Sequence, residues 1–484
     1  MGALTAIAST NEEKTFSYLF KMMNALKHRG HEAYGIAAKN LIEIHKTLSD
    51  FSSYKVDTVI GYNFTRILSC DIPQPLSSDD VKLAFEGRIY SVKGDFNLFE
   101  ILETFRRKGI EGADFLLKNM DGAYSFVLMI QDLLVAGRDP IGLIPLYYGE
   151  KPGLCAVATE KKALWTIGID HVKSFPPGFI GFFQQGKCSF RPVKILTKPE
   201  KKLTFSIEES VDRLKTLLFD AVASRIRNLK KAGLAFSGGL DSSIIAFLLK
   251  KCCVDVHLIT VGSIRSKEIN FAANLAEELS LPIHIRRFKA SEVEEILPRV
   301  IWLIEELSPL SVSISIPFYW IAETTANLKL KVLFTGQGGD ELFGGYRKYL
   351  DVFRSLGVNG VEETLFHDVK MSYRMNFERD EKVCAFHGIE MRLPFADWNL
   401  INYALRIPAS HKISSPEDPL RKIVLRKVAK SLGLPASVYE RKKKAVQYSA
   451  GVVKILKKIA KKKGRTISNF VEGHWERIRK KPTN

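Results

Sequence analysis

Two glycine-rich segments contain residue types that can bind and activate a phosphate ester. The first, SGGLDSS at 237–243, lies between a short apolar run, LAF at 234–236, and an apolar helical pattern. Glycines let backbone amides approach phosphate oxygens, and the N-terminus of a following helix favours negative charge. The chain contains no GxxxxGK[ST] pattern, so the segment is not a Walker A loop. It predicts a pyrophosphate-binding loop of another type.

The second segment, TGQGGDELFGGY at 335–346, places the adjacent carboxylates of Asp340 and Glu341 among five glycines. Carboxylates beside a polyphosphate are suited to Mg²⁺ ligation or to acid–base work. A glycine-rich surface turn with acidic residues is the alternative. Finding both segments in one chain favours a nucleotide site.

The elements around these segments indicate a parallel sheet. Ser206 and Glu209 can form a capping box for a helix, and the strands and helices that follow alternate along the chain. The expected strands are 234–236, 256–261, 283–288 and 331–336, and the expected helices include 270–279 and 291–307. Such alternation predicts a doubly wound sheet that binds ligands at the carboxyl ends of its strands.

The first 185 or so residues instead show short apolar runs punctuated by Gly, Pro and Asp, which is typical of strands and turns. A polar, proline-containing stretch at 186–204 predicts a domain boundary near residue 200. We therefore expect an N-terminal domain at 1–195, a nucleotide-binding domain at 205–460 and a basic tail at 461–484.

Composition excludes several classes of protein. Apolar residues make up 46% of the 484 residues and charged residues 26%, which fits neither a disordered chain nor a membrane protein. No apolar run approaches about 18 residues, and the N-terminus has no basic region before its apolar stretch, so we expect a cytoplasmic protein. The six cysteines show no metal-ligand spacing.

The net charge is +19, and +13 of it lies in residues 441–484. A solvated helical tail is the favoured interpretation of this charge. A nucleic-acid contact is the alternative and is not favoured.

The motifs together resemble those of the asparagine synthetase family, which includes β-lactam synthetase. NFERD at 376–380 and HGIEMRLPFAD at 387–397 match further family segments in order, as does the lysine-rich stretch at 421–451. HRG at 28–30, DGAYSF at 121–126, RDPIG at 138–142 and PLYYG at 145–149 are similar to its class II glutamine amidotransferase half. Departures are Ala396 in place of Leu, and Thr335-Gly336-Gln337 in place of Ser-Gly-Glu.

The resemblance implies an N-terminal nucleophile-type αββα sandwich. This is followed by an adenine-nucleotide α-hydrolase-like (HUP) domain, a doubly wound parallel sheet with a helical C-terminal part. It also implies ATP and Mg²⁺, with Asp241 and Asp340 as metal ligands. Glu341 and Lys443 are the implied catalytic residues, although Lys444 is an alternative to Lys443. The implied nucleotide contacts are Phe236, Ser237, Gly238, Gly239, Asp241, Ser242, Ser243, Val261, Thr335 and Gly336. Arg379, Glu390 and Arg392 are candidates for the acceptor pocket, and for them a buried structural ion pair is an equal alternative.

The glutaminase half departs from the family pattern at two places. Glutamine hydrolysis by this fold uses a cysteine exposed at the first residue after the initiator Met, because its thiolate attacks the amide. That residue is Gly2 here, and the oxyanion-binding Asn-Gly pair is replaced by Glu86-Gly87, whose charge would repel a developing anion. We expect this half to be a scaffold without glutaminase activity.

The resulting expectation is an ATP-dependent carbon–nitrogen ligase. It would adenylate a carboxylate, by default the aspartate side chain, release AMP and pyrophosphate, and use free ammonia or ammonia supplied by another protein. Two alternatives stay open. One is an enzyme that adenylates tRNA or another carboxylate, and the other is a non-catalytic regulatory pseudo-synthetase. The intact 237–243 and 335–346 motifs weigh against the second.

Overall fold

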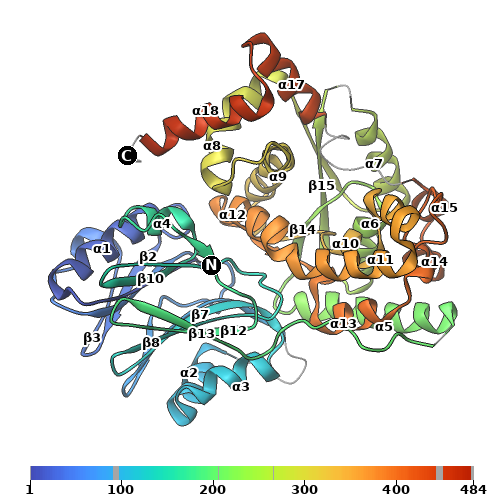
Figure 1. Ribbon diagram of the computed structural model, residues 1–484. Coiled ribbons are helices and arrows are strands. Elements are labelled where there is room, and N and C mark those ends of the chain that lie inside the picture. Colours follow the sequence, from blue (N-terminus) through green and yellow to red (C-terminus); the bar gives the residue numbers. More distant parts are fainter. Residues whose placement is uncertain (1, 91–96, 205, 265, 443–450, 481–484) are drawn as a thin grey trace. The chain divides into compact units, whose positions relative to one another are not determined.

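The chain folds into two compact units in the computed structural model, which describes residues 2–90, 97–204, 206–264, 266–442 and 451–480. The N-terminal unit comprises the chain up to Leu196 together with Ala385–Gly388, and the C-terminal unit comprises Thr197–Cys384 and the chain from Ile389 onward. Figure 1 shows the elements of both units.

The N-terminal unit contains two antiparallel sheets. The seven-stranded sheet has the order β11-β9-β10-β1-β4-β2-β3 and the six-stranded sheet the order β13-β12-β8-β7-β6-β5. The elements are β1 (Gly2–Ser9), α1 (Glu12–Ala25), β2 (Ala33–Ala38), β3 (Leu41–His45), η1 (Leu48–Asp50), β4 (Thr58–Phe64), β5 (Leu76–Ser78), β6 (Val81–Ile89), α2 (Leu98–Lys108), α3 (Glu111–Asn119), β7 (Gly122–Ile130), β8 (Leu133–Arg138), β9 (Tyr147–Lys151), β10 (Leu154–Ala158), α4 (Lys161–Trp165), β11 (Lys173–Ser174), β12 (Phe179–Gln184) and β13 (Lys187–Pro192).

Side-chain alternation along β1 explains why this unit has four layers. Ala3 and Ile7 pack with α1 and α4 on the outer face, whereas Leu4, Ala6 and Ala8 pack against the other sheet. Helices α2 and α3 cover the far face of the second sheet, so that a helix pair, two sheets and a second helix pair lie in succession (Figure 1). The predicted αββα sandwich is confirmed.

The C-terminal unit is built on a parallel sheet of order β16-β15-β14-β17-β18. Its elements are α5 (Ile207–Arg225), β14 (Lys231–Ala235), α6 (Leu240–Lys251), β15 (Asp255–Ser263), α7 (Lys267–Glu278), β16 (Ile283–Phe288), α8 (Ala290–Ile304), α9 (Pro309–Asn327), β17 (Val332–Phe334), α10 (Gly339–Phe343), α11 (Lys348–Ser372), η2 (Tyr373–Phe377), α12 (Glu378–Phe386), β18 (Glu390–Arg392), η3 (Pro394–Ala396), α13 (Trp398–Arg406), η4 (Ala409–His411), α14 (Ile423–Ser431), α15 (Ala436–Tyr439), α17 (Val452–Lys462) and α18 (Ile467–Lys480). The predicted parallel-sheet domain with a helical C-terminal part is confirmed.

Strand order brings the two glycine-rich segments together. Strands β14 and β17 are neighbours in the sheet, with Leu234 opposite Phe334. The first segment follows β14 and the second follows β17, so both leave the sheet at the same edge. The sheet thereby brings the residues of the two glycine-rich segments together, because the carboxyl ends of parallel strands lie on one side of the sheet.

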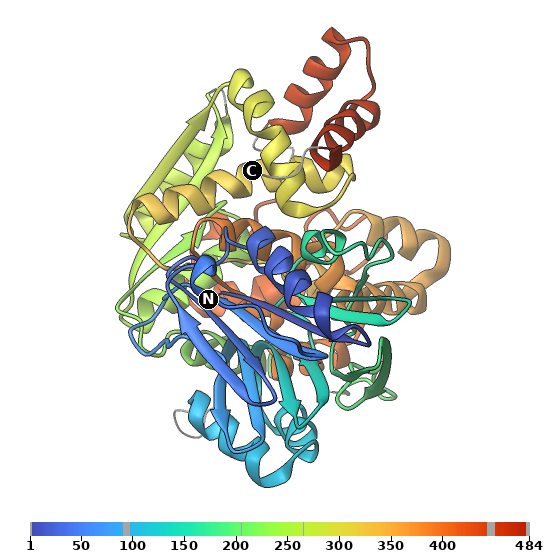
Figure 2. The ribbon, with the colours of Figure 1, turned by 90° about the vertical axis from the view of Figure 1, so that its left-hand side faces the viewer.

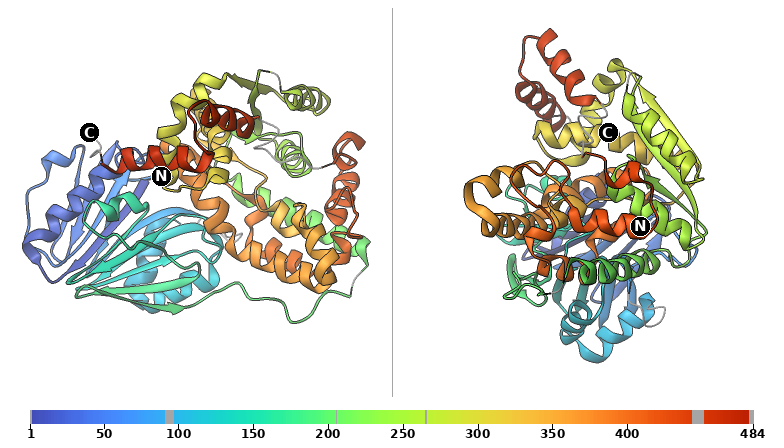
Figure 3. Two further views of the ribbon diagram at one scale, coloured as in Figure 1. Left: turned by 45° about the horizontal axis from the view of Figure 1, so that its top comes forward. Right: turned by 90° about the vertical axis from the view of Figure 1, so that its right-hand side faces the viewer.

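The basic C-terminal helices pack on this unit. Helix α17 contacts α8 and α9 through an apolar face that includes Leu456 and Ile459, and α18 contacts α8 through a face that includes Phe470. Figures 2 and 3 show the red helices beside the yellow ones. The boundary predicted at residue 460 falls inside α17.

Among the described residues no single helix is long and apolar enough to span a membrane. The pair α8 and α9 passes that test only when taken together, and it is bent by 108° at the break.

The capping box at α5 offers a test of the local fold. Ser206 Oγ accepts from Glu209 N at 3.2 Å, and Glu209 Oε2 accepts from Ser206 N at 2.8 Å, as the sequence predicts. Ser206→Ala should cost about 1 kcal/mol of local stability, because it leaves a helix N–H without its acceptor. Faster hydrogen exchange at the first turn of α5 would show this. Thr204→Ala, an exposed position outside the helix, is the control and should leave that exchange unchanged.

Candidate active site

The segment after β14 forms the first wall of the candidate site. Gly238 has φ +64°, which favours glycine, and a Cβ there would lie 2.9 Å from the Phe271 ring. Ser237 Oγ accepts from Gly239 N at 3.2 Å and lies 3.3 Å from Ser242 Oγ. Hydrogen bonds within the loop therefore hold it at the N-terminus of α6, where it is suited to bind an anion.

The segment after β17 packs directly on this loop. A Cβ at Gly336 would lie 2.9 Å from Asp241 Cβ, and one at Gly339 would lie 2.7 Å from Asp241 Oδ1. A Cβ at Gly345 would clash with Asp340 Oδ1 at 1.9 Å. These glycines leave the space that the two aspartates occupy.

A buried lysine joins the two aspartates. Lys422 Nζ lies 2.7 Å from both carboxylate oxygens of Asp241 and 2.6 Å from Asp340 Oδ1. The Lys422 side chain is 3% exposed, so its charge is screened little by water. Sequence reasoning missed this residue, although it lies in the lysine-rich stretch at 421–451, because nothing in that stretch distinguishes a buried lysine from a solvated one.

The backbone at Lys422 is held in an unusual conformation. Arg421 and Lys422 both have φ of 56°, in the left-handed region that non-glycine residues rarely adopt. Asp418 Oδ1 accepts from the Arg421 amide at 2.9 Å, and the Arg421 side chain donates to Gly345 O at 3.1 Å. Strain of this kind persists where the surrounding contacts over-determine it, and such positions cluster at functional sites.

Glu341 lies in α10, next to Asp340, and is buried. Its Oε1 accepts from Tyr346 Oη and from Asn376 Nδ2, both at 2.7 Å. Burial, followed by the negative charge of Asp340, raises the pKa of the Glu341 carboxyl. A carboxyl group with a raised pKa is suited to general base catalysis near neutral pH.

The three acceptor-pocket candidates are already paired inside the fold. Arg379 donates to both carboxylate oxygens of Asp380 at 2.7 and 2.8 Å, and Gln337 donates to the same carboxylate. On β18, Arg392 lies 2.6 Å from Glu390 Oε1 and also donates to Arg225 O.

The remaining predicted nucleotide contacts lie along the same sheet edge. Phe236 directly follows β14 and is buried, with its amide 2.8 Å from Ile259 O of the neighbouring β15. Val261 lies near the carboxyl end of β15, and Thr335 follows β17. Ser243, in the first turn of α6, is buried. Lys443 and Lys444 lie outside the described residues.

The donor set at Asp241 and Asp340 fits Mg²⁺. Both carboxylates bind one ammonium group, so their oxygens face a common point. Mg²⁺ is usually held by one or two carboxylates together with substrate phosphates, which matches two aspartates beside an anion-binding loop.

The start of β1 in the N-terminal unit has no room for a larger side chain. A Cβ at Gly2 would lie 2.0 Å from Asn63 O and 2.8 Å from the Tyr62 ring. Tyr62 Oη donates to Glu86 Oε2 at 2.6 Å, and both residues are buried. Gly87 has φ +113°, and a Cβ there would lie 2.0 Å from Ala123 O. The phenol of Tyr62 therefore fixes the carboxylate of Glu86. Glu86 is the residue at the position where the family resemblance predicts an oxyanion-binding asparagine.

Removing the lysine between the aspartates tests the electrostatics of the candidate site. Lys422→Met should destabilise the protein by about 3 kcal/mol, because it leaves the buried Asp241 and the partly buried Asp340 without their cation. Urea unfolding would measure the loss, and added Mg²⁺ should recover part of it by supplying positive charge at the same place.

The matched control is Lys427→Met on α14. Lys427 is exposed and pairs with Glu208 at 3.0 Å, so its removal should cost less than about 1 kcal/mol. Equal losses for the two variants would contradict the importance of Lys422.

Comparisons with known proteins identify the family of this chain. A model of the asparagine synthase family matches residues 213–357 and 354–470, and a glutamine amidotransferase domain model matches residues 67–166. A putative glutamine-hydrolysing asparagine synthetase of Methanocaldococcus jannaschii is 28% identical, with 98% of each chain covered. Asparagine synthetase B of Escherichia coli is 27% identical over 89% of this chain and 78% of its own.

A solved glutamine phosphoribosylpyrophosphate amidotransferase from B. subtilis covers 58% of this chain and 65% of its own at 16% identity. Its TM-score is 0.35. The family models cover more than half of the chain and match both units. The chain therefore belongs to the asparagine synthase family of ligases, with a glutamine amidotransferase domain in its N-terminal unit.

Proposed function

We propose that this protein is an ATP-dependent ligase that converts a carboxylate, by default the side chain of aspartate, into an amide with ammonia as the nitrogen source. The observation that carries the proposal is the meeting of Asp241, Asp340 and Lys422 beside the glycine loop at one sheet edge. Membership of the asparagine synthase family supports it, as do the names of the relatives from M. jannaschii and E. coli.

Charge explains why the reaction needs ATP. A carboxylate is a poor electrophile because its negative charge repels nucleophiles. Attack of a carboxylate oxygen on the α-phosphorus of ATP forms an acyl-adenylate and breaks the bond to pyrophosphate. Ammonia then attacks the acyl carbon, and AMP leaves with the electron pair of the carbon–oxygen bond.

The charge of the departing pyrophosphate must be neutralised as it develops. In the proposal the backbone amides of 237–243 bind its oxygens, and Asp241 and Asp340 hold Mg²⁺, which supplies positive charge there. Lys422 balances the two aspartates, and we propose it as part of the site. Lys443, or its neighbour Lys444, would contact the α-phosphate from the segment outside the described residues.

The nucleotide base and ribose would lie against Phe236, Val261, Thr335 and Gly336, which lie at or near the carboxyl ends of three neighbouring strands. The charges of Arg379, Glu390 and Arg392 are already paired within the fold. We therefore propose that these residues shape the wall of the acceptor pocket and do not form the ion pairs that bind the substrate.

Glu341 is proposed to act in the second half-reaction. Attack by ammonia leaves an extra proton on nitrogen, and the carboxylate of Glu341 would accept it. Tyr346 and Asn376 donate to one of its oxygens, which fixes the orientation of the group. Because burial raises the pKa of Glu341, its conjugate base is a better proton acceptor than an exposed glutamate.

The N-terminal unit is proposed to be silent as a glutaminase. A cysteine at position 2 would overlap Asn63 O and the Tyr62 ring, and the buried Glu86 would oppose an oxyanion. Ammonia would then come from solution or from another protein.

Asparagine formation tests the nitrogen source. With ATP, Mg²⁺ and aspartate, we expect ammonium to support asparagine formation and glutamine to give none. Gly2→Cys should stay inactive with glutamine, because the space for its side chain is filled. Activity of the unaltered protein with glutamine would refute the silent glutaminase, and absence of reaction with every nitrogen source would remove aspartate as the acceptor.

Glu341→Gln separates the two half-reactions. Amide formation at saturating ammonia should fall about 100-fold, because general base catalysis is lost. Exchange between ATP and labelled pyrophosphate in the presence of aspartate should change little, because adenylation does not use Glu341.

A pH profile gives a second readout for Glu341. At a constant concentration of free ammonia, the rate of amide formation by the unaltered protein should rise with pH as Glu341 loses its proton, with a midpoint above the ordinary pKa of glutamate. This rise should be absent in Glu341→Gln. Tyr346→Phe, which removes one donor to the carboxyl, should have a smaller effect. Equal loss of exchange and amide formation in Glu341→Gln would contradict the assignment.

A further inference from the structure

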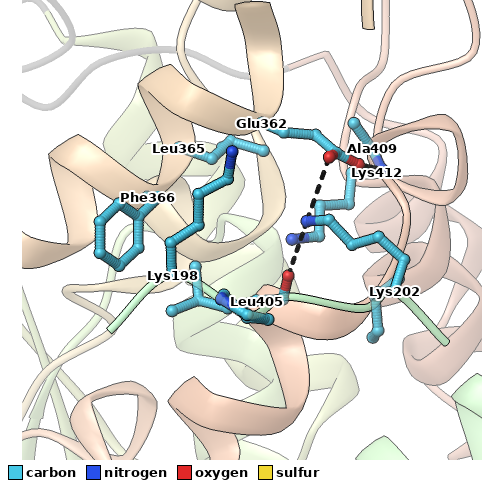
Figure 4. Close-up of a pocket in the computed structure, with 10 residues that line it drawn as sticks. Lys198, Lys202, Glu362, Leu365, Phe366, Leu405, Ala409 and Lys412 are labelled. Carbon is cyan, nitrogen blue, oxygen red and sulfur yellow. Dashed lines mark hydrogen bonds and ion pairs between the residues drawn. The ribbon is translucent and has the colours of Figure 1, made fainter. Parts of the chain in front are cut away.

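A small cavity in the C-terminal unit contains three lysines that the proposed reaction does not use. It is lined by Lys198 and Lys202 from the segment before α5, by residues of α11 that include Glu362, and by the segment 405–412 (Figure 4). Its volume of about 10 Å³ is room for one water molecule or one ion of similar size.

Two of these lysines have partners. Lys202 Nζ lies 3.3 Å from Glu362 Oε2 and donates to Leu405 O at 2.9 Å, while Glu362 Oε1 accepts from the Ala409 amide at 3.2 Å. Lys198 pairs with Glu363. Each of these two positive charges is thus balanced by one carboxylate.

Lys412 has no such partner. It is 1% exposed, and among the described residues its ammonium group has no hydrogen bond or ion pair. Burial, followed by repulsion from Lys202, lowers the pKa of Lys412 to about 7, although Glu362 opposes the shift. Figure 4 shows the Lys202 and Lys412 side chains converging beside Glu362.

The net charge around this cavity is therefore +1 when Lys412 is protonated. The three positive charges are those of Lys198, Lys202 and Lys412, and the two negative charges are those of Glu362 and Glu363. A buried charge without a partner is costly, and an anion would remove that cost. We propose that the cavity binds one small monovalent anion of halide size between Lys202 and Lys412.

The position of Lys412 connects this site to the candidate active site. Ile423 N donates to Lys412 O at 3.0 Å, which closes the loop 412–423 at its base. That loop carries Lys422, the residue between Asp241 and Asp340. An anion that orders Lys412 would therefore stabilise the loop that positions Lys422.

Thermal unfolding of the full chain in potassium chloride and in potassium gluconate of equal ionic strength tests the proposal without any catalytic readout. At about pH 6 chloride should raise the unfolding midpoint by about 3 °C over gluconate. The difference should shrink at about pH 8.5, because a neutral Lys412 has no charge for an anion to balance.

Variants assign the effect to the cavity. Lys412→Met should abolish the chloride increment, whereas the control Lys430→Met, at an exposed position on α14, should retain it. Glu362→Gln removes the competing carboxylate but keeps an acceptor for the Ala409 amide, so it should enlarge the rise in the unfolding midpoint caused by chloride. This variant also assigns the effect to the cavity if Lys412→Met does not fold.

Three results would overturn the proposal. These are equal midpoints in chloride and gluconate at about pH 6, a chloride increment that persists in Lys412→Met, and stabilisation by phosphate with none by chloride.

Discussion

The ion cluster of Lys422, Asp241 and Asp340 is the interaction on which the arrangement of the C-terminal unit depends. Two carboxylates that share one ammonium group repel each other, and the buried Asp241 and the partly buried Asp340 lose much of their hydration, so a cation must lie close to both. The structure supplies one ammonium group within 2.7 Å of both. A Cβ at Gly336, Gly339 or Gly345 would lie too close to one of the aspartates. The absence of side chains at these three positions therefore provides the space for the cluster.

The cluster also explains why residues distant in the chain must meet. Asp241 lies in the first turn of the helix after β14, and Asp340 lies in the first turn of the helix after β17. Lys422 is the N-cap of α14 and one of two left-handed residues at the end of the preceding loop. The parallel sheet brings the first two together because its strands end at one edge. The third depends on the loop 412–423, whose base contains the buried Lys412. The loop 412–423 thus connects the proposed anion site, which contains Lys412, with the proposed catalytic site, which contains Lys422.

The N-terminal unit has the amidotransferase-type fold but different residues at the positions expected for the nucleophile and the oxyanion-binding group. Its two sheets and covering helices are complete, and β1 is buried along its whole length. At the beginning of that strand, however, Gly2 lies against Asn63 and Tyr62, and the phenol of Tyr62 binds Glu86. The space beside the start of β1 is therefore filled without a nucleophilic side chain. For this reason we regard the unit as a scaffold for the proposed ammonia-dependent reaction.

The sequence by itself determined the fold class, the family and most elements of the sheet, because strand and helix periodicity and the glycine motifs are local signals. It placed Asp241, Asp340 and Glu341 at strand ends, and the capping box at Ser206 was predictable from two residues. Only the tertiary structure decided which of many lysines is buried between the aspartates, that Asp380 pairs with Arg379 and Gln337, and that Tyr62 binds Glu86. These contacts join residues from separate elements, and burial, which decides whether a lysine is solvated or a counter-ion, is a property of packing that no local pattern contains.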